Sequence, residues 1–166
     1  MYTSNNLKIT IIDDDPAMTE MLKDFFAKNF SGSIITAFIS GETALQGIYF
    51  EPDIIVLDYH LDSMNAEAMN GLQVLKKLKD QFPNVPVIFL SSQEKSEVAA
   101  NTMKYGAYDY IVKNENAFHR LEIILNNIRG QAALKKNLGT QKVFNTILAI
   151  LVVALVVGFI AMRMMK

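Results

Sequence analysis

The sequence predicts an α/β protein in which a doubly wound sheet of five parallel strands is followed by one C-terminal transmembrane helix. Three observations lead to this prediction. Short apolar runs alternate with helical patterns along most of the chain, as in a parallel sheet covered by helices on both faces. The run Ile54–Leu57 is continuously apolar, as expected of a central strand buried on both faces. The segment 143–162 carries no charged residue.

The first half of the sheet begins with a strand over 8–12, which stops at consecutive aspartates. Apolar residues at helical spacing then predict a helix, and Pro16 suits its first turn. A second strand covers 33–38. Ser40 is the expected N-cap of a helix that runs to about Phe50.

The second half repeats the alternation of strands and helices. Its expected elements are a strand over 54–57, a helix carrying Leu72, Leu75, Leu78 and Phe82, a strand over 87–90, a helix around 94–105, a strand over 108–112 and a last helix from about Asn116 that turns Leu121, Ile124, Leu125 and Ile128 inward. Pro83 ends the first of these helices, and Gly106 ends the second.

The far end of the chain has the composition of a membrane span. At a rise of 1.5 Å per residue, the uncharged segment is about 30 Å long, which matches the hydrocarbon core of a bilayer. A buried core helix is the alternative, but such a helix is normally shorter and apolar on one side only. Lysines and an arginine precede the segment, which places the globular domain on the cytoplasmic side of a cell membrane.

Four parts follow from this division of the chain. They are a globular domain over 1–130, a polar and basic linker over 131–142, a single transmembrane helix over 143–162 and a short tail over 163–166.

Composition excludes several classes of chemistry. The formal net charge of -1 gives no reason to expect nucleic-acid binding. The absence of cysteine excludes disulfides, thiolate metal sites and cysteine nucleophiles. Two histidines are too few for a multi-histidine metal centre. Aspartate is therefore the main source of reactive groups.

Polar residues stand where four of the expected strands end. They are Asp13 and Asp14, then Asp58, Ser91 and Lys113. In a doubly wound sheet, the ligand lies beyond the carboxyl ends of the strands, so these side chains are expected to meet in one crevice. Clustered carboxylates need a neutralising cation, and a few hard oxygen ligands suit Mg²⁺. A carboxylate can also attack phosphorus to form an aspartyl phosphate.

Four segments resemble the response-regulator receiver family. They are Ile11–Pro16, Pro52–Asp58, Pro86–Ser92 and Gly106–Lys113. The resemblance covers roughly Leu7–Ile128. It implies a CheY-like fold of the flavodoxin type with strand order 2-1-3-4-5, and a non-enzymatic role in the bacterial two-component phosphorelay between histidine and aspartate.

The resemblance also implies residue roles. Asp58 would accept a phosphoryl group from a histidine kinase or a histidine phosphotransfer protein. Mg²⁺ would be held by Asp58 and Asp14 directly, by Asp13 through water, and by the backbone carbonyl of His60. Ser91 would act together with Lys113.

The side chains of Ser91 and Lys113 would both contact the phosphoryl oxygens. In this family the switch hydroxyl, here Ser91, moves towards the phosphate, and an aromatic residue, here Tyr110, swings inward behind it. We also expect His60 and Gln93 to tune the lifetime of the phosphoryl group through the access of water. Ordinary loop residues are the alternative for His60 and Gln93.

The sequence departs from the family in three places. The connection from Asp58 to Gly71 is several residues longer than usual and lacks a Met-Pro pair. Asn114 stands where proline usually follows the lysine, which predicts a changed loop or a trans bond, because a cis bond without proline costs about 2.5–4 kcal/mol. Ser91 replaces the commoner threonine.

Simpler explanations exist for each residue taken alone. Asp13, Asp14 and Asp15 could only stabilise a helix N-terminus. Lys113 could be a solvated surface lysine, and Tyr110 a half-buried strand aromatic. Two other functions also remain open: a phosphohydrolase with Asp13 as nucleophile and Asp15 as acid/base, and a membrane-bound docking module without phosphorylation.

The output of such a protein would pass through protein contacts. We expect a downstream target to bind the face formed by the fourth helix, the fifth strand and the fifth helix. Ala154 and Gly158, four residues apart in the apolar segment, could allow two helices to approach and form a homodimer. Such pairs also arise by chance in apolar stretches.

Overall fold

The structure is a computed structural model that describes residues 6–61 and 68–164, with the backbone alone for some residues of its last helix. It divides into two compact units, residues 1–122 and 123–166. The first unit contains the sheet, four complete helices and the start of a fifth. The second unit consists of the continuation of that fifth helix.

The first unit is built on a five-stranded parallel sheet. The strands are β1 (Lys8–Ile12), β2 (Ile34–Phe38), β3 (Ile54–Leu57), β4 (Val87–Ser91) and β5 (Asp109–Val112), in the order β2-β1-β3-β4-β5. The CheY-like α/β fold and the strand order expected from the sequence are therefore confirmed.

The burial of each strand follows from its composition. Every residue of β3 and β4 is buried, which explains their unbroken apolar runs. Edge strand β2 is only partly covered. In the register of β1 and β3, Ile12 lies beside Leu57, so the next residues, Asp13 and Asp58, leave the sheet together.

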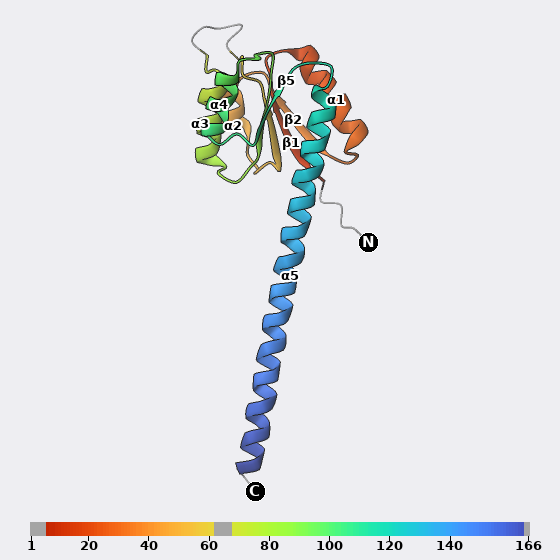
Figure 1. The fold of residues 1–166 in the computed structure, drawn as a ribbon, viewed down its shortest axis with the longest axis vertical. Coiled ribbons are helices and arrows are strands. Elements are labelled where there is room, and N and C mark those ends of the chain that lie inside the picture. Colours follow the sequence, from red (N-terminus) through yellow and green to blue (C-terminus); the bar gives the residue numbers. More distant parts are fainter. Residues whose placement is uncertain (1–5, 62–67, 165–166) are drawn as a thin grey trace. The chain divides into compact units, whose positions relative to one another are not determined.

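Helices cover both faces of the sheet. They are α1 (Pro16–Asn29), α2 (Gly41–Gly47), α3 (Gly71–Gln81), α4 (Ser96–Lys104) and α5 (Ala117–Met164). Figure 1 shows α1 on one face and α2, α3 and α4 on the other. Phe118 at the start of α5 packs against Phe25 of α1, with ring centroids 5.3 Å apart.

Side-chain caps fix where the first three helices begin. The Asp15 carboxylate accepts a hydrogen bond from Ala17 N, and the Ser40 hydroxyl accepts one from Thr43 N. Asn70 and Gln73 form a reciprocal capping box at the start of α3. The predicted N-cap at Ser40 is therefore confirmed.

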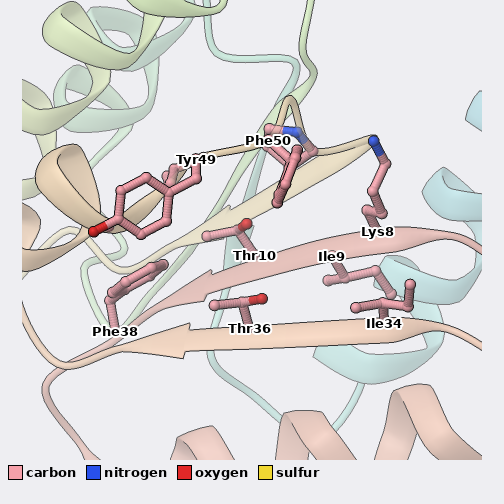
Figure 2. Close-up of a pocket in the computed structure, with 11 residues that line it drawn as sticks. Lys8, Ile9, Thr10, Ile34, Thr36, Phe38, Tyr49 and Phe50 are labelled. Carbon is pink, nitrogen blue, oxygen red and sulfur yellow. The ribbon is translucent and has the colours of Figure 1, made fainter.

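Helix α2 ends at Gly47, earlier than the predicted end near Phe50. A side chain at Gly47 would stand 2.5 Å from the Phe38 ring, so the helix approaches β2 closely here and then stops. Tyr49 and Phe50 are left exposed. A pocket of about 230 Å³ opens beside them over β1 and β2, with Thr10 and Thr36 on its floor (Figure 2).

The linker expected over 131–142 is helical, because α5 runs without a break from Ala117 to Met164. No proline interrupts this stretch, and alanine, leucine and lysine, which favour helices, dominate residues 132–136.

The membrane span predicted over 143–162 is not supported by the structure. Within the residues that the structure describes, no helix combines the length and the apolar character needed to cross a membrane. In this segment, the side chains of residues 143 and 152–161 lie outside the described residues, as do residues 165 and 166 of the predicted tail.

Candidate functional site

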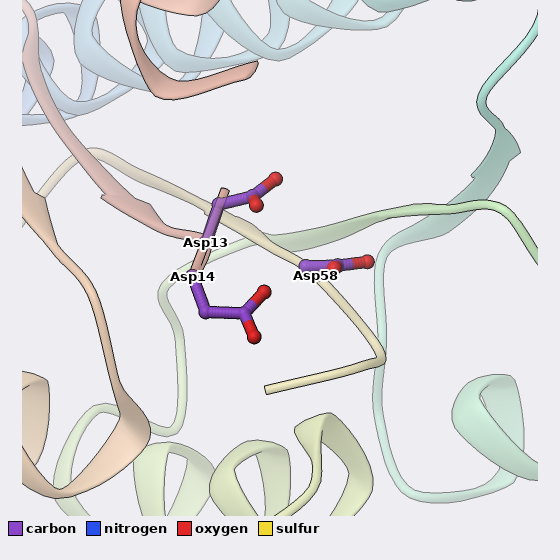
Figure 3. Close-up of side chains that lie close together, drawn as sticks. All are labelled: Asp13, Asp14 and Asp58. Atoms are coloured by element: carbon purple, nitrogen blue, oxygen red, sulfur yellow. The ribbon is translucent and has the colours of Figure 1, made fainter. Parts of the chain in front are cut away.

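Three carboxylates meet at the carboxyl edge of the sheet. Asp13 and Asp14 follow β1, and Asp58 follows β3. One oxygen atom from each lies within 4.8 Å of the others (Figure 3). Asp13 and Asp58 are buried, and Asp14 is half-buried. The convergence expected from the strand ends is therefore present, and its oxygen ligands suit a hard cation such as Mg²⁺.

Lys113 provides positive charge at the same edge of the sheet. It follows β5, and its Nζ atom donates a hydrogen bond to Asp13 Oδ2 at 3.0 Å. The same Nζ lies 3.3 Å from Asp58 Oδ2. Its side chain is only 16% exposed, so Lys113 is not the solvated lysine of the simpler explanation.

Burial and charge shift the pKa values of this group in opposite directions. Burial raises the pKa of Asp13 and of Asp58 above the ordinary carboxyl value, while the Lys113 ammonium opposes the rise. Burial alone would lower the pKa of Lys113, but Asp58 and Asp13 raise it above its ordinary value. Three carboxylates lie beside this one lysine, and such a balance of charge favours a bound cation.

Backbone hydrogen bonds orient two of the carboxylates. Asp13 Oδ1 accepts a bond from Asp15 N at 2.9 Å, and Asp58 Oδ1 accepts one from Tyr59 N at 2.7 Å. Asp15 itself is exposed and caps α1. The helix-terminal role considered for the acidic run therefore applies to Asp15, while Asp13 and Asp14 join the cluster.

Ser91 and Tyr110 lie together on neighbouring strands. Ser91 is fully buried, and its hydroxyl accepts a hydrogen bond from Gln93 N. Tyr110 is only 7% exposed, stacks on Phe89, and donates its hydroxyl proton to Gln93 O at 2.8 Å. Tyr110 is therefore buried rather than half-buried, and its switching role stays a prediction.

The segment after Asp58 is held at both of its ends. His60 is half-buried and packs edge-on against Tyr59. Gly71 N donates to Tyr59 O at 2.8 Å, which closes the base of the long connection. Residues 62–67, which contain most of its extra length, lie outside the described residues.

Sequence reasoning missed two residues beside the site. A side chain on Gly71 would stand 2.3 Å from the Asp58 carbonyl oxygen. Glu42 of α2 accepts a hydrogen bond from Met69 N at 2.8 Å. A glycine at the end of a long connection was the available signal for Gly71. No local pattern links Glu42 to a residue twenty-seven positions away.

Asn114 replaces the expected proline without disturbing the strand end. The bond from Lys113 to Asn114 is trans, as are all peptide bonds that the structure describes. The Asn114 side-chain oxygen accepts a hydrogen bond from Asn116 N, and its carbonyl accepts one from Ala117 N. Asn114 therefore forms a turn that leads into α5. The bond before it is trans, as predicted.

The parallel sheet, its acidic cluster and the lysine at its carboxyl edge define an α/β signalling domain of the phospho-acceptor class. The response regulator receiver domain family matches residues 9–125. The chain belongs to this family. Receiver domains accept phosphate from histidine kinases or phosphotransfer proteins in two-component signalling, and they typically bind Mg²⁺ at an acidic pocket.

Known proteins similar to this chain have different overall lengths. The glycerol metabolism activator of Pseudomonas putida is 29% identical over 138 residues, which are 81% of this chain and 60% of that protein. A protein-glutamate methylesterase/protein-glutamine glutaminase of Geobacillus kaustophilus is 32% identical over 64% of this chain and 30% of its own length. The chain thus spans less than two thirds of each.

Among solved structures, the Francisella response regulator 1452 receiver domain is similar to the chain. The identity is 29% and the TM-score is 0.65. The match covers 76% of this chain and 99% of that domain. This match to an isolated receiver domain agrees with the family match over residues 9–125, which spans most of the first unit and the first residues of the second.

Proposed function

We propose that the protein is a phospho-accepting response regulator, in which Mg²⁺-dependent phosphorylation of Asp58 switches its protein contacts. The observation that supports this most directly is Lys113 Nζ, which lies 3.0 Å from Asp13 and 3.3 Å from Asp58 at the end of a family-matched sheet. Phosphoryl transfer depends mainly on positioning and on positive charge near the equatorial oxygens.

Each residue of the site has one task in this proposal. Asp58 Oδ2, which lies 3.3 Å from Lys113 Nζ, attacks the phosphorus atom of the donor and the bond from phosphorus to the donor's histidine nitrogen breaks, while Tyr59 N–H holds Asp58 Oδ1 in place. The Lys113 ammonium is positioned to pair with a phosphoryl oxygen. The buried Ser91 hydroxyl can donate its proton to the phosphoryl group. In its hydrogen bond with Gln93 N–H, the same hydroxyl uses its oxygen atom as the acceptor.

The donor set fits Mg²⁺ well. Asp13, Asp14 and Asp58 would hold the ion together with the backbone carbonyl of His60, since one oxygen of each carboxylate lies within 4.8 Å of the others. When bound, Mg²⁺ supplies charge neutralisation between the carboxylates and a phosphoryl group.

Mass spectrometry of the intact, detergent-solubilised full-length chain tests the proposal. With Mg²⁺ and a small-molecule phosphodonor, we expect one added phosphoryl group, and we expect none in Asp58→Asn or after chelation of Mg²⁺. An unlabelled but folded wild type would instead favour the docking module. A label that survives in Asp58→Asn but is lost in Asp13→Asn would favour the phosphohydrolase.

The same preparation tests the residues proposed to control the switch and its lifetime. Ser91 and Tyr110 share Gln93 as a hydrogen-bond partner, so a shift of Ser91 towards the phosphate would disturb the Tyr110 contact. We propose that His60 and Gln93 limit the approach of water to the aspartyl phosphate. An unchanged rate of dephosphorylation in His60→Ala would remove His60 from this role.

The partners and output follow from the same proposal. The phosphoryl donor is a histidine kinase or histidine phosphotransfer protein, and no nucleic acid is involved. The output is a protein contact at the face formed by α4, β5 and the start of α5, without an enzymatic activity of the chain itself.

We further propose that the uncharged segment 143–162 anchors the protein in the cell membrane as a single span, with the receiver domain in the cytoplasm. The support is the sequence: the segment is as long as a bilayer core, and basic residues precede it. The span could also bring two chains together through Ala154 and Gly158. Tethering would raise the effective concentration of the domain near a membrane-bound partner.

Cell fractionation tests this anchor. We expect the full chain in the membrane fraction after an alkaline carbonate wash, and a truncation after Gln141 in the soluble fraction. A full chain that is released by the wash would contradict a membrane span. Unchanged self-association of Gly158→Ile in detergent would contradict a dimer through the small residues.

A further inference from the structure

A chain of close contacts connects the start of α2 to the backbone of Asp58. It begins at Gly41, where an added Cβ would stand 2.1 Å from Val74 Cγ2 of α3. Only a glycine allows this approach, so the first turn of α2 rests directly against α3. The Ser40 cap fixes the same turn. The backbone of Glu42, which belongs to this turn, is therefore held in a fixed position.

Glu42 uses this position to hold the end of the long connection after Asp58. Its carboxylate oxygen Oε1 accepts a hydrogen bond from Met69 N at 2.8 Å. This bond is the main reason that the pKa of Glu42 is lowered, so the group is ionised at neutral pH. A charged acceptor strengthens the bond relative to a neutral one. Met69 is thereby fixed directly before the N-cap of α3.

The contact continues from Met69 to the phospho-acceptor strand. Asn70 caps α3 through the reciprocal bond with Gln73. Gly71 then donates its N–H to Tyr59 O and lies against the Asp58 carbonyl. Tyr59 N in turn holds Asp58 Oδ1 at 2.7 Å. Each step links neighbouring backbone atoms, so a shift at Met69 reaches the reactive carboxylate within a few residues.

We propose that Glu42 is a positioning residue for the phospho-acceptor site, acting through Met69 and Gly71 on the backbone that holds Asp58 and the His60 carbonyl. The inference rests on the proposed function of Asp58. In this proposal Glu42 acts through the backbone and is not itself a ligand of the metal or of the phosphoryl group. Its effect is to keep the segment after Asp58 in the arrangement that the metal and the phosphoryl group require.

A set of three variants in the full-length chain tests the inference. Glu42→Ala removes the acceptor, Glu42→Gln keeps a neutral amide oxygen, and Gln46→Ala changes an exposed residue of the same helix as a matched control. Hydrogen exchange at the Met69 amide reports the contact itself. Mg²⁺ affinity and the rate of labelling by a small phosphodonor report the site, under conditions where urea titration shows each variant to be folded.

We expect faster exchange at Met69 in Glu42→Ala, together with a Mg²⁺ dissociation constant raised about tenfold, the low end of the range for residues that support metal ligands, and a similar loss in labelling rate. Glu42→Gln should lie between Glu42→Ala and wild type, and Gln46→Ala should equal wild type. Glu42→Ala with unchanged Met69 exchange, or with Mg²⁺ affinity within about twofold of wild type, would overturn the inference. A wild type that takes no label would instead overturn the proposed function.

Discussion

Replacing Gly71 by alanine is expected to destabilise the receiver domain by about 3 kcal/mol or more. An added Cβ would stand 2.3 Å from the Asp58 carbonyl oxygen and 2.7 Å from Tyr59 Cα. Both atoms belong to the backbone, so no side-chain rearrangement can relieve the clash. Either α3 or the end of β3 must move, and that movement would also displace Asp58.

Urea unfolding of Gly71→Ala measures this effect, and the labelling assay measures its consequence at the site. We expect a lower unfolding midpoint and little or no phosphoryl uptake. Gly130→Ala is the control, because Gly130 is exposed in α5 and an added Cβ meets no atom within 4 Å. Alanine favours a helix there by about 1 kcal/mol. A Gly71→Ala variant as stable as wild type would show that the backbone around Asp58 can yield.

Replacing Lys113 by methionine is the second change with a large expected effect. It leaves Asp13 and Asp58 buried next to each other without their shared cation. Breaking a buried ion pair by removal of one partner typically costs about 3–5 kcal/mol. We expect a loss of this order in the metal-free protein at neutral pH, together with loss of labelling.

The pH dependence of this loss has a definite sign. Burial already raises the pKa of Asp13 and Asp58, and without Lys113 both pKa values rise further. A group with a raised pKa binds protons more readily in the folded state, so it favours folding below its unfolded pKa and this contribution is lost as the pH rises. The deficit of Lys113→Met should therefore shrink as the pH falls from 7 towards about 4.

Urea titrations of wild type and Lys113→Met across this pH range, without metal, measure the difference directly. The double variant Lys113→Met with Asp58→Asn is the control, because it removes one of the two uncompensated carboxylates and should recover part of the stability at pH 7. A deficit that stays constant with pH would mean that Lys113 stabilises the domain through packing of its aliphatic chain rather than through its charge.

Much of the architecture followed from local patterns in the sequence. The apolar run of β3 and the cap at Ser40 each depend on residues close together in the chain, and so does the stop of α4 at Gly106, which has a φ of 91°. The aspartates, Ser91 and Lys113 could be placed at one edge, because all strands of a parallel sheet end on the same side.

The differences from prediction concern helix ends, which depend on contacts that local sequence patterns do not reveal. Helix α2 ends at Gly47, where it approaches Phe38 of another element closely, and α5 runs on through the residues expected to form a linker. Helix ends depend on such packing and on the absence of an alternative cap, so propensity alone places them poorly.

The sequence by itself determined the sheet, its order through the family resemblance, and the identity of the acidic group with its lysine. Only the tertiary structure decided which atoms meet: Lys113 between Asp13 and Asp58, Asp15 at a helix end, Tyr110 turned inward to Gln93. It also revealed the path from Glu42 through Gly71. The physical reason is that hydrogen bonds and steric limits act over a few ångströms in space, whatever the separation along the chain.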